Sequence, residues 1–186
     1  MYSVHNAGAV LFTGAVLFIT GVHLAEFIYP GYSVSGNYIS DLGVRQPSAP
    51  VFNASVALLG ISILLGSYFL WQEFHSTLIS VFLGLAGAGA IGVGVFPGTA
   101  GVIHVIVSLM AFLFGGLSAI ASCRLVKAPF NYFSVLSGMT SLTALILFAS
   151  DIYLGLGPGG MERMIVYPVL VWVAGLGGYL MAAAGS

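Results

Sequence analysis

The stretch TLISVFLGLAGAGAIGVGVF at residues 77–96 contains no charged side chain. Its length matches the roughly 20 apolar residues that a helix needs to cross the hydrocarbon layer of a membrane. Outward from this stretch, apolar runs between turn signals predict six spans at about 8–29, 51–71, 77–96, 102–123, 131–153 and 163–183. The sequence therefore predicts an all-α polytopic membrane protein, with residues 1–186 forming one compact transmembrane bundle.

The composition supports a membrane class and excludes several functions. Only 5% of the 186 residues are charged, against about a quarter in soluble domains. A net charge of -1 leaves no basic surface that would neutralise phosphates, so nucleic acid is excluded as a partner. Cys123 is the single cysteine, which excludes an intrachain disulfide. Residues 1–7 carry no Lys or Arg, so the first apolar run is expected to be a retained span rather than a signal peptide.

An even number of spans places both termini on one side of the membrane. We call this the near side, and it includes the short connections 72–76 and 124–131. The far side carries the connections 30–50, 97–101 and 154–162, which are rich in Pro and Gly turn signals.

Orientation depends on four cations. Arg124 and Lys127 lie on the near side, and Arg45 and Arg163 lie on the far side. The far-side pair has acidic neighbours and is expected to be committed to pairing, whereas Arg124 and Lys127 fit a cytoplasmic anchor. The expected location is the cell membrane, with cytoplasmic termini.

The 26 glycines predict close helix packing. In membrane spans, small residues let helix backbones approach each other. The stretches 84–94 and 175–178 place glycine on most faces of two helices, and we expect Gly87 and Gly177 to tolerate no larger side chain.

Ionisable side chains gather toward the far side. Each costs about 2.5–3.5 kcal/mol near the centre of a span, so their placement is informative. The cluster consists of His23, Glu26, Asp41, Arg45, His104, Asp151, Glu162 and Arg163. No comparable cluster is expected at mid-membrane.

These residues suggest an intramembrane site for a lipid or isoprenoid headgroup. His104 or His23 is a candidate general base, and Glu26 or Asp41 a candidate for orienting it. The candidate substrate-binding residues are Arg163 and Arg45, which would hold an anionic group, together with Asn37, Ser40, Asn53 and Asp151.

Structural explanations compete with these roles. His23 and Glu26 are three residues apart on one helix face and can satisfy each other. Asp151 and Arg163 bracket the last connection and are expected to form an ion pair across it.

Three other functions remain open. The chain is small enough to be a non-catalytic accessory subunit or scaffold, whose partners would be membrane lipids and other membrane subunits. A b-type haem between His23 and His104 is a further alternative. The sequence contains no HxxxH, HExxH or CxxC spacing, so no metal site is assigned. Transport is the weakest of these alternative functions, because the substrate sites of transporters normally lie near the membrane midplane.

Several far-side motifs, in this order, resemble a known family. They are Tyr29-Pro-Gly-Tyr-Ser33, Asn37-Tyr-Ile-Ser-Asp-Leu-Gly43, Val51-Phe-Asn53, Gly92-Val-Gly-Val-Phe-Pro97 followed by His104, and Gly159-Gly-Met-Glu-Arg163. The chain resembles, over nearly its whole length, the uncharacterised prokaryotic six-span membrane proteins of domain of unknown function 998.

The family has no established activity to transfer. The resemblance implies that Ser40, Asp41, Pro97, His104 and Arg163 occupy its recurrent polar and turn positions. Members of the family often have an acidic residue shortly after the Phe-Pro pair, where this chain has Gly98-Thr99. A role that needs this carboxylate would fall to Asp41 or Glu26.

Overall fold

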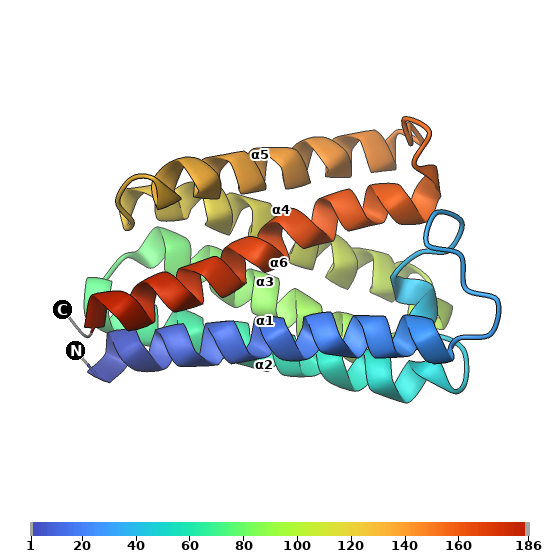
Figure 1. Cartoon of the computed structure of the whole chain (residues 1–186), viewed down its shortest axis with the longest axis horizontal. Coiled ribbons are helices and arrows are strands. Elements are labelled where there is room, and N and C mark those ends of the chain that lie inside the picture. The colour runs from blue at the N-terminus through green and yellow to red at the C-terminus, as the bar shows by residue number, and fades with distance from the viewer. Residues whose placement is uncertain (1, 185–186) are drawn as a thin grey trace.

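The computed structural model describes residues 2–184 and shows six long helices. They are α1 (Tyr2–Ile28), α2 (Ser48–Phe74), α3 (Thr77–Val95), α4 (Val102–Ala121), α5 (Phe130–Ala149) and α6 (Gly157–Ala184). All six are long and apolar enough to cross a membrane, which confirms the expected all-α membrane architecture. The first and last described residues lie at the same end of the bundle (Figure 1).

Several helix ends differ from the sequence-based expectation, and α1, for example, begins at Tyr2 rather than at residue 8. Helix α6 begins at Gly157, well before the expected start at residue 163. Its second residue is Pro158, and proline fits the first turn of a helix because its missing N–H has no partner there. Helix α5 ends at Ala149 rather than at residue 153, and Asp151, just after this end, takes a left-handed φ angle of 57°.

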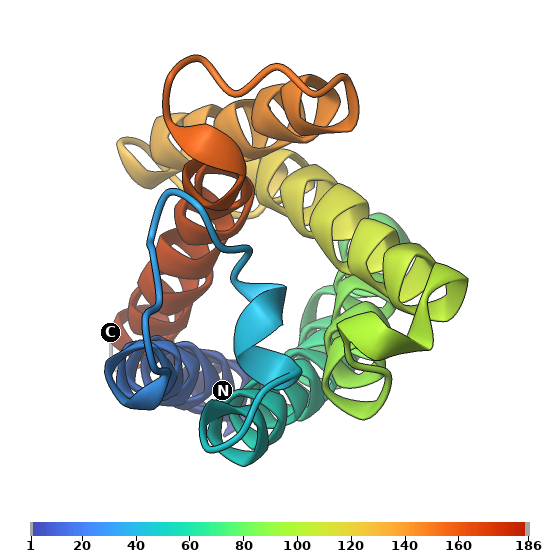
Figure 2. The ribbon, with the colours of Figure 1, turned by 90° about the vertical axis from the view of Figure 1, so that its right-hand side faces the viewer.

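Five helices form a ring and the sixth lies outside it. Viewed from the far side, α1, α2, α3, α4 and α6 follow one another around the ring (Figure 2). Helix α5 packs on the outside, against α4 and α6. The connection of residues 29–47, here called the cap, crosses the far end of the ring and contains the short 3-10 helix η1 (Ser40–Gly43).

Glycines lie where neighbouring helices approach most closely. A Cβ atom on Gly87 would lie 2.8 Å from the carbonyl oxygen of Gly60, at the crossing of α2 and α3. A Cβ atom on Gly177 would lie 2.7 Å from the carbonyl oxygen of Gly8, where α6 closes the ring onto α1. The expected packing role of Gly87 and Gly177 therefore has a direct geometric basis.

Helix α6 contains a proline close to a hydrogen bond from α5. Pro168 has no N–H to donate to the carbonyl group of Met164, which disturbs the local helix bonding. The Ser141 hydroxyl of α5 donates to the neighbouring carbonyl oxygen of Ile165 at 2.7 Å. This hydrogen bond links α5 to α6 at the residue after Met164.

A second polar contact joins three helices near the near side. The indole Nε1 of Trp172, which is fully buried in α6, lies 3.2 Å from the hydroxyls of both Ser122 and Ser134. Ser122 follows α4 and Ser134 belongs to α5. This shared hydrogen bond fixes α5 to the outside of the ring.

Candidate functional site

A cavity of about 100 Å³ lies inside the ring. Its walls are formed by α1, α2, α3, α4 and α6, and η1 of the cap closes its far end. The lining extends from Phe52 to Ile63 on α2 and from Glu162 to Val173 on α6, a depth of about 16 Å at the helical rise of roughly 1.5 Å per residue. The cavity therefore reaches about half-way through a hydrocarbon layer of about 30 Å.

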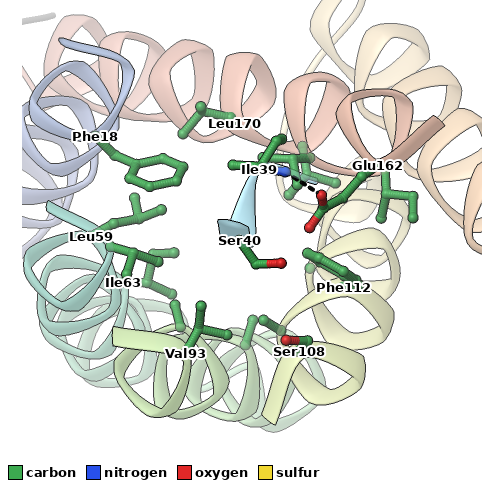
Figure 3. A pocket seen from close by; sticks show the side chains of 18 of the residues that line it. Phe18, Ile39, Ser40, Leu59, Ile63, Val93, Ser108, Phe112, Glu162 and Leu170 are labelled. Atoms are coloured by element: carbon green, nitrogen blue, oxygen red, sulfur yellow. Dashed lines mark hydrogen bonds between the residues drawn. The ribbon is translucent and has the colours of Figure 1, made fainter. Parts of the chain in front are cut away.

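Polar groups occur at only one end of this cavity. The three polar side chains in its lining are Ser40 of η1, Ser108 of α4 and Glu162 of α6. The rest of the lining is apolar or glycine, as Phe18 and Leu59 illustrate (Figure 3). The cavity thus combines a polar far end with an apolar interior.

Glu162 links the cavity to the cap. Its side chain is buried, and its Oε2 accepts a hydrogen bond of 2.5 Å from the backbone N–H of Ile39 (Figure 3). The bond joins residues 123 positions apart in the chain. Glu162 thereby both lines the cavity and holds its roof in place.

Arg163, the residue after Glu162 on α6, also holds the cap in place. Its Nη1 donates to the carbonyl oxygens of Val34 at 2.8 Å and Gly159 at 2.9 Å. Its Nη2 donates to Glu26 Oε1 at 2.5 Å and to the Tyr32 hydroxyl at 2.8 Å. With 8% of its surface exposed, Arg163 joins α1, the cap and α6.

The start of α6 fits against the backbone of the cap. The N–H of Gly159 donates to the carbonyl oxygen of Ser35 at 3.0 Å. A Cβ atom on Gly159 would collide with the carbonyl oxygen of Asn37. Glycine is required here because the two backbones are in contact.

Asn37 and Asp41 shape the cap instead of facing the cavity. The Asn37 side chain accepts from the N–H of Ser33 at 3.0 Å and donates to Asp41 Oδ2 at 3.2 Å. The same Asp41 oxygen accepts from the N–H of Tyr38 at 3.0 Å. Both residues therefore act as turn-stabilising side chains.

Asn53 tethers α2 to η1. Its Nδ2 donates to the carbonyl oxygen of Gly43 at 3.0 Å. Its Oδ1 is buried and has no hydrogen-bond partner. Asn53 is not among the residues that line the cavity.

The two far-side histidines lie in separate places. His23 is exposed on α1, and its Nδ1 lies 2.7 Å from the carbonyl oxygen of Ile19 in its own helix. The expected satisfaction of His23 by Glu26 is not formed, because Glu26 is paired with Arg163. His104 lies on α4, which is not a neighbour of α1 in the ring. This arrangement does not favour a haem between His23 and His104.

The expected ion pair between Asp151 and Arg163 is wrong. Arg163 pairs with Glu26, while Asp151 accepts a hydrogen bond of 2.8 Å from the Tyr153 hydroxyl. Arg45 is exposed and lies over the Tyr29 ring at 5.9 Å. Of the ten candidate catalytic and substrate-binding residues, Ser40 alone lines the cavity.

Sequence reasoning gave no role to the other two polar lining residues. Glu162 stands next to Arg163 in the Gly-Gly-Met-Glu-Arg motif, and its position beside a second ionisable residue was the available signal. Ser108 follows His104 by four residues and so shares a helix face with it. A serine in an apolar span gives no signal by itself.

Two tyrosines near the cap have raised pKa values for different reasons. Burial raises the pKa of Tyr32 to about 12, so its hydroxyl remains neutral as it accepts from Arg163. The hydrogen bond to the Asp151 carboxylate raises the pKa of Tyr153 to about 12.

Replacing Asp151 with asparagine is expected to lower the pKa of Tyr153 toward its ordinary value of about 10. The carboxylate charge disfavours the tyrosinate, and the amide removes that charge. Because folding raises this pKa, the hydrogen bond between Tyr153 and Asp151 stabilises the folded state fully below about pH 10. This stabilisation is lost as pH rises through about 12. Carbon NMR of labelled tyrosine rings measures the shift, with Y153F assigning the signal. The pKa of Tyr32, which is set mainly by burial, should stay unchanged.

Comparisons with known proteins give a family but no function. A family model described as "Protein of unknown function (DUF998)" matches residues 12–179. No curated protein and no solved structure matches the chain. Within residues 2–184, no three His, Cys, Asp or Glu side chains come together as metal ligands would.

Proposed function

Because the chain belongs to the family "Protein of unknown function (DUF998)", whose model covers every residue that lines the cavity, we propose a function from the cavity itself. The protein binds a membrane amphiphile with a single hydrocarbon chain. The part of the chain next to the head occupies the apolar interior, whose volume of about 100 Å³ admits only a segment of a long chain, and the polar head lies under the cap beside Ser40 and Glu162.

The observation that carries this proposal is the one-sided polarity of the cavity. An apolar pocket with a few convergent polar groups is the usual form of a small-molecule site. Here the polar groups lie toward the far ends of the spans and the apolar part reaches toward their middle. An amphiphile in a bilayer has the same arrangement.

The charges at the far end favour a head that donates hydrogen bonds. Glu162 lines the cavity and is an acceptor when ionised. Arg163 follows Glu162 in the sequence, and its Nη1 and Nη2 donate to Glu26, Tyr32 and the carbonyl group of Val34. A hydroxyl or amine head therefore fits better than a phosphate. This differs from the sequence-based expectation, in which Arg163 or Arg45 would hold an anionic group.

We also propose that the protein resides in the cell membrane with cytoplasmic termini. Arg163 is buried in cap contacts, whereas Arg124 and Lys127 are exposed on the near side. The cations at the surface are then Arg45 on the far side and Arg124 and Lys127 on the near side, and the excess on the near side favours a cytoplasmic location for it. A cysteine-accessibility experiment with A128C in a chain lacking Cys123 tests this orientation.

Filling the cavity is expected to abolish binding. Ala90 of α3 lines the cavity, whereas Ala88, two residues earlier, is exposed on the outside. We expect A90F to weaken binding of a fluorescent long-chain alcohol about tenfold or more, and A88F to leave it unchanged. Fluorescence titration of the detergent-solubilised protein measures both affinities, and thermal unfolding verifies that both variants fold.

Native mass spectrometry of the wild-type protein gives a second test. We expect one bound amphiphile per chain, lost in A90F. A folded A90F that retains the amphiphile would contradict the proposed site. A wild-type protein observed bare, or only with other subunits, would favour the accessory-subunit alternative.

A further inference from the structure

His104 and Ser108 form a hydrogen-bonded pair beside the cavity. They are four residues apart on α4, which places their side chains on one face. His104 Nε2 lies 3.3 Å from the Ser108 hydroxyl oxygen. His104 Nδ1 lies 2.7 Å from the carbonyl oxygen of Phe96, in the connection from α3.

The Phe96 carbonyl group sets the direction of the proton in this pair. A carbonyl oxygen only accepts hydrogen bonds, so the neutral His104 ring carries its proton on Nδ1. Nε2 is then unprotonated and accepts the hydrogen bond from the Ser108 hydroxyl. This is the arrangement of an activated nucleophile, in which a base contacts the serine and a third group orients the base.

The pair is located at the polar end of the cavity. Ser108 lines the cavity, while His104 stands behind it, half-buried. At the helical rise, Ser108 is about 9 Å from the start of α4 and Glu162 about 8 Å from the start of α6. Both therefore lie at a similar depth below the far side, near Ser40 of the cap.

We propose that Ser108 is a nucleophile, activated by His104, which cleaves an ester of the amphiphile bound in the cavity. This inference rests on the proposed function, because the cavity has to hold the substrate chain. Ser108 Oγ bonds to the ester carbonyl carbon while its proton passes to His104 Nε2. The bond from that carbon to the alcohol oxygen breaks, and the alcohol leaves with the proton from His104. Water then hydrolyses the acyl-serine, releasing a carboxylic acid and regenerating Ser108.

The lining indicates the class of ester. The part of the acyl chain next to the ester occupies the apolar interior, and the alcohol part lies toward Glu162, which accepts hydrogen bonds from free hydroxyls. The Ser40 hydroxyl, in the same lining, is available to donate to the developing oxyanion. The substrate class is thus a single-chain ester of a polyol, of the monoacylglycerol type.

A long-chain fluorophosphonate tests the nucleophile directly. Attack by Ser108 Oγ forms an O–P bond, releases fluoride and transfers the proton to His104. The detergent-solubilised full chain is treated with the probe, and the labelled residue is identified by peptide mass spectrometry. We expect labelling at Ser108, none there in S108A, and a rate lower by about 100-fold or more in H104Q.

Ser118 provides a matched control on the same helix. Its hydroxyl donates to the Phe114 carbonyl oxygen and it does not line the cavity. S118A should label at Ser108 at the wild-type rate. The same proteins are assayed for hydrolysis of a monoacylglycerol. We expect S108A to lose this activity.

Binding and chemistry are separated by titrating the fluorescent long-chain alcohol into S108A. The assignment of Ser108 as the nucleophile is supported if S108A binds the alcohol but shows neither labelling nor hydrolysis, while the wild type shows labelling and hydrolysis. A wild-type protein that binds the alcohol but neither labels nor hydrolyses would overturn this inference and leave the proposed function standing. A wild-type protein that binds no amphiphile would overturn both.

Discussion

Replacing Arg163 with methionine is expected to lower the free energy of unfolding by about 3–5 kcal/mol, the usual cost of removing one partner of a buried ion pair. The Glu26 carboxylate would lose its cationic partner at the membrane boundary. The carbonyl group of Val34 and the hydroxyl of Tyr32 would lose a donor as well. Thermal unfolding in detergent measures the loss, and faster proteolysis within residues 29–47 would report release of the cap.

Two comparisons isolate the ion pair. R45M removes an exposed cation that lies over the Tyr29 ring. It is expected to lower the free energy of unfolding by no more than about 1 kcal/mol. The double variant E26Q with R163M removes both charges and should recover part of the stability. If R163M unfolds at the wild-type temperature, Arg163 does not hold the cap.

Replacing Gly177 with alanine is expected to lower the free energy of unfolding by about 2–3 kcal/mol. The new Cβ atom would lie 2.6 Å from the backbone nitrogen of Phe12 and 2.7 Å from the Gly8 carbonyl oxygen. Both obstacles are backbone atoms, so relief requires α1 and α6 to separate. Because these helices close the ring, thermal unfolding in detergent should detect the change clearly.

Gly178 is a matched control, since a Cβ atom there meets nothing within 4 Å. G178A keeps the same helix and changes the same atoms. It should be neutral or stabilising by up to about 1 kcal/mol, because alanine favours a helix more than glycine does. Equal unfolding temperatures for G177A and G178A would show that α1 and α6 do not depend on this close approach.

The six spans follow from the sequence because length and hydropathy are local properties. The order of helices around the ring does not. A membrane helix presents apolar residues both to lipid and to its neighbours, so periodicity does not mark the inward face. Gly87 signals a close crossing, for example, yet nothing in its surroundings identifies Gly60 as the partner. The sequence does not predict the position of α5 outside the ring either.

The far-side location of the polar residues also follows from the spans, but their partners depend on ring closure. Asp151 was the acidic residue nearest to Arg163 across the connection, whereas the actual partner, Glu26, is 137 positions away. The two become neighbours because α6 packs against α1. Glu162 could not be assigned a role before the cap was known to reach it.

The position of α6 in the ring has a consequence for biosynthesis. The cap is made early, but the residues that fasten it, Glu162 and Arg163, are translated more than one hundred positions later. Until then Glu26 stands at the membrane boundary without its partner, which is unfavourable in lipid. A nascent chain that ends after α5 therefore lacks one of the five helices that line the cavity. Only insertion of residues 157–184 completes the ring.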